Sequence, residues 1–148
     1  MQVDAKLFGL VKAFRTVMDR EVQGDFVLFG SAAISLNGID LQREIADLDV
    51  FVSATTFERL KHRFALEWKG GKHSERVPFY KPAPDIEILQ SFPGVSFDEV
   101  QKRASQTPES EGFPVGALDD LVVWKKAQGR DKDLKDIAAI QTQLAQFR

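Results

Sequence analysis

Apolar residues recur along this chain with two different periods, one typical of helices and one of strands. Over residues 4–22 they are spaced three or four apart with basic residues between them, which predicts an amphipathic helix. The apolar positions of this helix are Leu7, Leu10, Val11, Phe14 and Met18. Apolar runs at 25–29, 46–52 and 85–90 are too short for helices and predict strands.

A turn of small residues follows the first strand. Gly30-Ser31 leads into the segment 32–36, which we expect to form a short helix with Ser31 as its N-cap. Asn37-Gly38 should end this helix, because both residues tolerate the left-handed backbone conformation. A polar connection, 39–45, then leads to the second strand.

The middle of the chain predicts a helix, a hairpin and then the strand over 85–90, the third of the apolar runs. Apolar residues at helical spacing indicate a helix over 55–66. Gly70-Gly71, which lies between basic residues, predicts the turn of a hairpin over 66–80. Pro82 and Pro84 should delay the third strand, because proline cannot donate to a strand ladder.

The last third of the chain is predicted to be mainly helical. A short helix is expected over 96–103, with Ser96 as its N-cap. Two longer helices are expected over 118–128 and 132–147. Gly129-Arg130-Asp131 separates them, since glycine favours a helix end and aspartate a helix start.

Length and composition are those of an ordinary globular protein. The 148 residues, 43% apolar and 28% charged, suffice for one domain whose core should include Trp68 and Trp124. The mixture of elements predicts an α/β (α+β) fold, with a small mixed twisted sheet flanked by helices. We expect a single domain over 1–148, with its α/β core in 1–115 and a helical pair in 116–148.

Composition also limits the chemistry. The chain has no cysteine and two scattered histidines, so any metal is expected to have oxygen ligands. No apolar run is long enough to cross a bilayer, and Met1–Gly9 lacks a signal-peptide core. We therefore expect a cytoplasmic protein with no membrane partner. The net charge of −2 gives no general attraction to nucleic acid.

Carboxylates are concentrated on two of the predicted strands. Asp47 and Asp49 are separated by one residue, so they share a face of their strand while the residue between them points to the core. Glu87 and Asp85 share a face of the next strand in the same way. A hard cation would keep such carboxylates ionised together. The alternative is a solvated edge strand whose charges discourage aggregation.

Four ordered motifs together resemble one known family. They are Phe29-Gly30-Ser31, then Arg43 with Asp47-Leu48-Asp49, then Ile86-Glu87-Ile88-Leu89 with Pro93-Gly94-Val95-Ser96-Phe97, and finally Lys125 with Arg130 to Ile137. Their order is similar to that of the polymerase-β-like nucleotidyltransferase superfamily, in its minimal bacterial, AbiEii-like branch. The resemblance covers Val27 to Leu144 and implies a nucleotidyltransferase fold with a helical C-terminal part. Glu87 departs from it, because the family usually has aspartate there.

The resemblance implies a two-metal phosphoryl transfer with Mg²⁺ or Mn²⁺ as the cofactor. Asp47 and Asp49 would hold the metal ions. Glu87 would be the third ligand or the general base, and Asp85 is the alternative third carboxylate.

The same resemblance assigns the triphosphate to a second group of residues. Backbone N–H groups around Gly30 and Ser31, with the Ser31 hydroxyl, would bind the phosphates. Lys125 would reach the leaving phosphates, or else it is an exposed lysine of an amphipathic helix. Arg43 would contact phosphate, or else pair with an acidic neighbour such as Glu44.

The implied function is the metal-dependent transfer of a nucleoside monophosphate from a nucleoside triphosphate to a hydroxyl of RNA, protein or a small molecule. A tRNA is one candidate acceptor. Related stand-alone domains often serve as toxins or antibiotic-modifying enzymes, which would add a cognate antitoxin or another partner protein. The alternatives are a catalytically quiet module that binds nucleotide or a partner, and a purely structural cation site.

Overall fold

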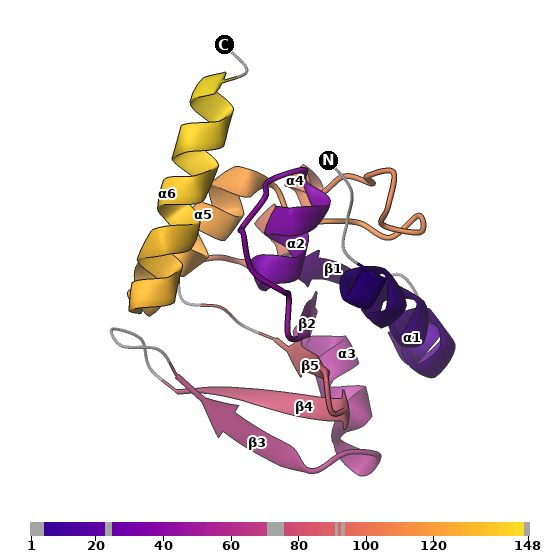
Figure 1. The fold of residues 1–148 in the computed structure, drawn as a ribbon. Coiled ribbons are helices and arrows are strands. Elements are labelled where there is room, and N and C mark those ends of the chain that lie inside the picture. Colours follow the sequence, from indigo (N-terminus) through magenta and orange to yellow (C-terminus); the bar gives the residue numbers. More distant parts are fainter. Residues whose placement is uncertain (1–4, 23–24, 71–75, 91, 93, 147–148) are drawn as a thin grey trace.

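The structure, a computed structural model, is a mixed α/β fold built on one five-stranded sheet (Figure 1). It describes residues 5–22, 25–70, 76–90, 92 and 94–146. The strands are β1 (Phe26–Phe29), β2 (Leu48–Val52), β3 (Leu66–Lys69), β4 (Val77–Ala83) and β5 (Ile86–Leu89). Their order across the sheet is β1-β2-β5-β4-β3, and β2 and β5 run parallel while the other neighbours are antiparallel.

Six α-helices and one 3₁₀ turn complete the described part of the chain. They are α1 (Ala5–Val22), α2 (Gly30–Leu36), α3 (Ala54–Arg59), η1 (Leu60–His62), α4 (Phe97–Arg103), α5 (Leu118–Gln128) and α6 (Asp131–Gln146). No helix among the described residues is both long enough and apolar enough to cross a membrane.

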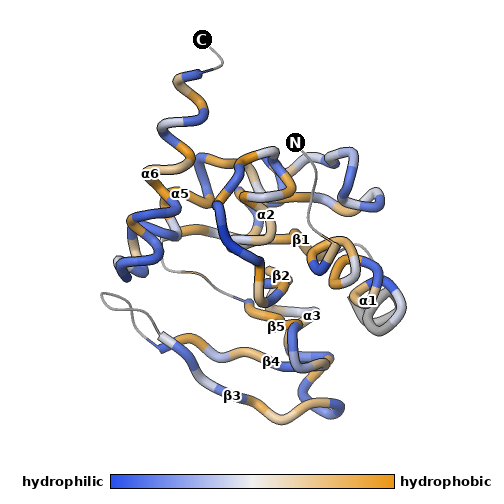
Figure 2. The backbone as a smooth tube through the Cα atoms, viewed as in Figure 1, coloured by the Kyte–Doolittle hydropathy of each residue, from blue (hydrophilic) through white to orange (hydrophobic). Residues whose placement is uncertain are grey.

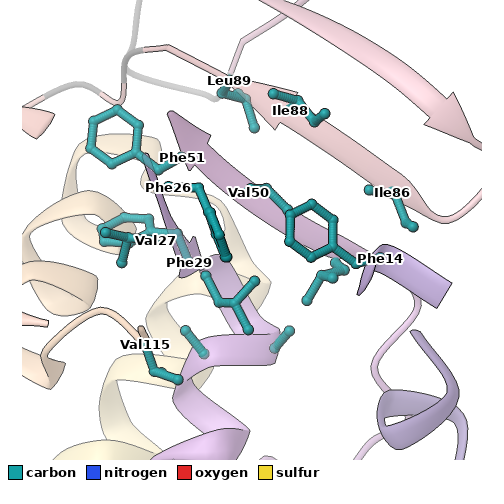
Figure 3. Packing of buried hydrophobic residues seen from close by; sticks show 14 of the residues in the cluster. Phe14, Phe26, Val27, Phe29, Val50, Phe51, Ile86, Ile88, Leu89 and Val115 are labelled. Atoms are coloured by element: carbon teal, nitrogen blue, oxygen red, sulfur yellow. The ribbon is translucent and has the colours of Figure 1, made fainter. Parts of the chain in front are cut away.

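Side chains alternate along each strand, and β1, β2 and β5 bury residues on both faces of the sheet. Phe26 lies on one face, where Phe14 of α1 packs edge-on against it with ring centroids 5.1 Å apart. Phe29 and Phe51 lie on the other face and contact each other and Phe92. Figure 3 shows the rings of Phe14, Phe26, Phe29 and Phe51 together with aliphatic residues of β2 and β5.

The C-terminal helices belong to the same core as the sheet. Trp124 of α5 lies 5.8 Å from the Phe29 ring and 5.0 Å from the Phe92 ring, between centroids, and Leu121 is fully buried. α5 packs in turn against α6. The predicted helical pair is therefore attached to the sheet by apolar contacts. Figure 2 shows how the polar connection between α2 and β2 contrasts with the apolar strands.

Several predicted elements are confirmed. The first helix, the strands around 26–29 and 86–89 and the helix 118–128 occur within a residue or two of their expected bounds. The expected hairpin is formed by β3 and β4, although Gly71 at its turn lies outside the described residues. Phe147, the expected end of the last helix, also lies outside them.

The predicted caps are partly wrong. α2 begins at Gly30, with Phe29 at the N-cap position, so Ser31 lies inside the helix and does not cap it. Gly38 has the expected left-handed conformation with φ +88°, but Asn37 has φ −79°. Ser96 occupies the N-cap position of α4 without making a side-chain cap bond. Ser31 finds charged partners elsewhere in the fold, which local spacing cannot reveal.

Two predictions in the middle of the chain are also wrong. The helix expected over 55–66 ends with η1 at His62, and Leu66 opens β3 instead. Pro82 does not precede the next strand but lies within β4, next to an irregularity of register between Tyr80 and Ala83. A strand tolerates proline at such a place because the ladder is already interrupted there.

The two tryptophans differ. Trp124 is 3% exposed, as expected of a core residue, whereas Trp68 is 51% exposed on the edge strand β3. The prediction for Trp68 is therefore wrong, because hydrophobicity alone does not tell an edge strand from a central one.

Candidate active site

Two carboxylates lie side by side on the face of the sheet that α5 covers. The parallel register of β2 and β5 places Asp49 directly opposite Glu87. Both are mostly buried, with 14% and 13% of their side-chain surface exposed. Because the two residues occupy neighbouring strands on one face, the sheet itself fixes their proximity.

Lys69, the last residue of β3, is the cation that faces this pair. Its ammonium group donates a hydrogen bond to Glu87 and lies 3.5 Å from Asp49 Oδ1. Burial would lower the pKa of Lys69, but the charges of the two carboxylates raise it above its usual value. Lys69 therefore neutralises part of the negative charge of the two acids.

The pKa values of Asp49 and Glu87 are shifted in opposite directions by this environment. Burial raises the pKa of Asp49 to about 7, and the charge of Glu87 adds to this effect while Lys69 opposes it. Burial would also raise the pKa of Glu87, but the charge and hydrogen bond of Lys69 lower it below its usual value. Near neutral pH, Glu87 is therefore ionised while Asp49 is close to its titration midpoint.

The other two candidate acids are placed differently from each other. Asp47 precedes β2 and lines the same cleft as Asp49 and Glu87. Asp85 is exposed in the turn before β5, and its carbonyl accepts a hydrogen bond of 2.8 Å from the Leu48 N–H. The prediction that Asp85 shares a strand face with Glu87 is wrong, because the chain is still turning at Asp85.

Gly30 shapes the floor beneath Asp49. It has φ +68°, a conformation that favours glycine, and a Cβ added there would lie 3.0 Å from Asp49 Cγ and closer still to a carboxylate oxygen. Glycine is therefore needed at this position for two independent reasons. Its lack of a side chain is what lets the Asp49 carboxylate lie against the start of α2.

The Gly30→Ala variant is expected to lose about 2 kcal/mol or more of unfolding free energy, since it combines left-handed strain with a clash against Asp49. Urea denaturation followed by circular dichroism measures this loss. Gly38→Ala is the matched control, because Gly38 also has positive φ but nothing within 4 Å of an added Cβ. If the two variants lose equal stability, the contact with Asp49 carries no weight.

Ser31 is the meeting point of two basic side chains. Lys125 Nζ donates to Ser31 Oγ at 2.8 Å, and the Arg43 guanidinium donates to the same oxygen at 3.0 Å. Both cations also pair with Asp136 Oδ2, Lys125 at 2.8 Å and Arg43 at 2.7 Å. Arg43 therefore pairs with Asp136 and not with Glu44, whose partner is Lys6.

Lys125 is buried and fully engaged. Only 1% of its side chain is exposed, and it makes a third contact, with Asp133 Oδ1 at 3.2 Å. An ammonium group has three N–H donors, and these three acceptors use them all. The alternative of an exposed lysine on an amphipathic helix is thus wrong. Whether Lys125 contacts phosphate stays a prediction.

Asp133 and Asp136 belong to the fourth motif of the sequence, but they were not predicted to be the buried partners of site residues. They are fully or nearly fully buried at the start of α6, and Arg130 closes the cluster by donating to both oxygens of Asp133. Their chemistry was visible in the sequence only as a charged helix start. The sign that they face inward was their spacing of three, which places them on one side of a helix together with Ile137 and Ile140.

The acidic pair and the basic side chains around Ser31 line one cleft of about 220 Å³. One wall carries carboxylates and the other carries cations. Its lining residues are Ser31, Arg43, Ile45, Ala46, Asp47, Asp49, Lys69, Glu87, Trp124, Lys125, Arg130 and Lys132. Burial and the charges of Arg130 and Lys125 lower the pKa of Lys132, so an anion bound there would be stabilising.

The donor set suits a hard cation that shares its ligands with a substrate. Across the described part of the chain, no three Asp, Glu or His side chains are grouped closely enough to hold a metal ion by themselves. Mg²⁺ is nevertheless commonly bound by one or two carboxylates together with water and substrate phosphates. Asp49 and Glu87, with Asp47 in the same cleft, fit that mode of binding.

Comparisons with known proteins add one structural similarity. No family model matches the sequence, and no curated protein matches it either. Among solved structures, the chain is similar to the crystal structure of JHP933 from Helicobacter pylori, with 16% identity and a TM-score of 0.48. The match covers 92% of this chain and 66% of that one, so the chain spans just under two thirds of its length. A similarity this distant supports no statement about activity.

Proposed function

We propose that the protein is a metal-dependent nucleotidyltransferase, which moves a nucleoside monophosphate from a nucleoside triphosphate to a hydroxyl acceptor. The observation that carries this proposal is the cleft in which Asp49 and Glu87 face Arg43, Lys125, Arg130 and Lys132. Carboxylates suit a divalent cation, and cations suit polyphosphate. A cleft with both kinds of group matches a metal–triphosphate substrate, which needs both at once.

The acidic wall is assigned to the reacting end of the triphosphate. Asp47, Asp49 and Glu87 would hold Mg²⁺ or Mn²⁺, which when bound neutralises charge that develops on the phosphoryl oxygens. Where Glu87 is not a metal ligand, it takes the proton of the acceptor hydroxyl as general base. The acceptor oxygen then bonds to the α-phosphorus, the bond from that phosphorus to the bridging oxygen breaks, and pyrophosphate leaves.

The basic wall is assigned to the leaving phosphates. Arg43 and Ser31 line the cleft together, and both Arg43 and Lys125 donate hydrogen bonds to the Ser31 hydroxyl. Gly30 precedes Ser31 and lies against Asp49. Arg43 is 35% exposed at its side chain and so remains accessible to a ligand. Lys132, which has no ion pair among the described residues, supplies a further positive charge at the same wall.

We assign the acceptor to a groove that adjoins this cleft. A groove of about 1160 Å³ runs between the connection 38–43 and α6, and it shares Arg43 and Lys132 with the cleft. A groove of this size exceeds the usual volume of a small-molecule pocket, about 300–1,000 Å³, and so suits a macromolecular acceptor such as RNA.

The test is transfer of label from a triphosphate carrying labelled α-phosphate. The purified chain is incubated with each of the four triphosphates, Mg²⁺ or Mn²⁺, and total RNA or cell protein. The proposal expects label on one acceptor class and stoichiometric release of pyrophosphate. Absence of labelling under every combination, with the triphosphate still raising thermal stability, would favour a catalytically quiet nucleotide-binding module. The ion pair of Lys69 with the acids is the observation that favours this second candidate.

The Lys69→Gln variant separates a metal site from a structural ion pair. Without metal, the variant is expected to melt at a lower temperature than the wild type, because two buried carboxylates lose their cation. Added Mg²⁺ or Mn²⁺ should then raise its melting temperature by more than it raises that of the wild type.

Differential scanning fluorimetry over a metal titration measures both effects. Lys61→Gln is the control, since Lys61 is an exposed lysine paired with Glu58 away from the cleft. A metal-induced rise no larger in Lys69→Gln than in Lys61→Gln would argue against a metal bound by Asp49 and Glu87.

A further inference from the structure

The outer edge of the sheet is open. β3 is the last strand in the order β1-β2-β5-β4-β3, so it pairs with β4 on one side and with no described strand on the other (Figure 1). Two large apolar side chains point to one face of this strand, Leu66 with 45% exposure and Trp68 with 51%. A pocket of about 370 Å³ lies beside them, lined also by Phe64, Pro78 and Tyr80. Edge strands with exposed apolar side chains invite pairing with another chain.

The backbone groups of Trp68 face the open edge. Trp68 lies directly opposite Pro78 in β4, and proline has no N–H to donate. That position must therefore be a non-hydrogen-bonded pair, in which the N–H and C=O of Trp68 point away from β4. By the same alternation, Leu66 also points its backbone groups outward, while Glu67 and Lys69 bond to β4.

The side chains of β3 are self-complementary in one antiparallel register. If two copies meet with Trp68 opposite Trp68, then Glu67 of each copy lies opposite Lys69 of the other. The neighbouring register, with Glu67 on the axis, places two carboxylates opposite each other and is disfavoured. Glu67 has no ion-pair partner among the described residues. Lys69 uses two of its three N–H donors on Asp49 and Glu87, which leaves one for a third acceptor.

We propose that β3 is the interface for a second copy of this chain. The two sheets join edge to edge along antiparallel β3 strands, with Trp68 on the twofold axis and two Glu67–Lys69 pairs beside it. The two Trp68 side chains then pack against each other on the face of the sheet that carries the pocket beside Leu66 and Trp68. The outward backbone groups of Leu66 and Trp68 form hydrogen bonds with the backbone of the second copy. Both clefts lie on the same side of the joined sheet, because a twofold axis normal to the sheet preserves its faces.

An engineered cysteine tests the register directly. The chain has no cysteine, so Trp68→Cys introduces a single thiol. In the proposed register the two introduced thiols face each other across a pair whose Cα atoms are about 5.5 Å apart, within the range of a disulfide. Under mild oxidation we expect a disulfide-linked dimer on a non-reducing gel. Glu67→Cys is the matched control. In the proposed register, position 67 lies opposite position 69 of the other copy, so the two introduced cysteines are offset along the strands by two residues. Their Cα atoms are then farther apart than the upper limit for a disulfide, about 7 Å.

Mass measurement of unmodified protein tests the interface without a covalent trap. Sedimentation equilibrium over the micromolar range should show a dimer for the wild type. Trp68→Pro should be monomeric yet folded, since it removes only an outward N–H and an exposed side chain. Glu67→Lys should weaken the dimer at least about tenfold through the introduced repulsion of Lys69. Leu134→Ala, which removes another exposed apolar side chain, should leave the mass unchanged.

Three outcomes would overturn the proposal. They are a wild type that stays monomeric throughout, a dimer that survives Trp68→Pro, and equal cross-linking of Trp68→Cys and Glu67→Cys. A monomer that pairs through β3 with an extended segment of another protein would belong to the first outcome. Each result is read from mass or cross-linking, so it is independent of whether nucleotidyl transfer is found.

Discussion

Asp49→Asn is expected to slow nucleotidyl transfer by at least about a thousandfold. Asp49 is one of the two carboxylates that the sheet holds side by side, and a metal bound there supplies several kcal/mol of charge stabilisation, at about 1.4 kcal/mol for each tenfold in rate. Glu87→Gln should lose a similar amount. The measurement is the initial rate of label transfer from the α-labelled triphosphate at saturating Mg²⁺.

The matched control is Asp85→Asn, because Asp85 is exposed outside the cleft and should be dispensable. Full activity in Asp49→Asn, or its loss in Asp85→Asn alone, would mean that the acidic pair is not the reacting centre.

Asp49→Asn is expected to lose activity but to gain stability. The pKa of Asp49 is raised to about 7 in the folded protein, so folding favours its neutral form. This contribution to stability is fully present below the pKa of the unfolded chain and is lost as pH rises through about 7. In metal-free buffer at about pH 8, Asp49→Asn should therefore melt at a higher temperature than the wild type. Loss of activity with a gain in stability would exclude misfolding as the cause.

Lys125→Met is expected to cost about 3 kcal/mol of unfolding free energy or more. Lys125 is 1% exposed and pairs with two buried carboxylates, Asp133 and Asp136, so its removal leaves buried negative charge with too few partners. The methionine fills a similar volume, which confines the change to the charge. Urea denaturation at neutral pH measures the loss.

Two further variants define the cause of that loss. Lys126→Met removes the neighbouring exposed lysine and should change stability by about 0.5 kcal/mol or less. Adding Asp133→Asn and Asp136→Asn to Lys125→Met should restore part of the loss, because the unpaired charges are then removed together. A loss in Lys125→Met that matches that of Lys126→Met would show that the cluster does not hold α5 and α6 together.

Local periodicity predicted the elements on which the site is built. The alternation in 46–52 and 85–90 identified the two strands and placed Asp49 on the face opposite the residues that point to the core, because side-chain direction in a strand depends only on position. It did not predict that Asp49 and Glu87 are mostly buried on that second face. The helix 118–128 was equally clear, since its apolar spacing and the glycine after it are local signals. Strand order and register were not predicted, because they depend on contacts between distant segments.

The partners of the site residues followed from no local rule. Lys69 was seen as part of a basic turn, yet the hairpin carries its ammonium group back to Asp49 and Glu87. Ser31 was expected to cap a helix, but Lys125 and Arg43 compete for its hydroxyl from segments far along the chain. Charged partners outweigh a local cap bond, since hydrogen bonds to ions are about twice as strong as neutral ones.

The parallel pairing of β2 and β5 determines when the candidate site forms during folding. Parallel neighbours cannot be joined by a tight turn, and here α3, β3 and β4 all lie between them in the chain. Asp49 and Glu87 therefore meet only after this long loop has closed, a step that is slow because its entropy is lost before the contacts form. A chain leaving the ribosome or a partly folded intermediate would carry every carboxylate of the site and still lack the site itself.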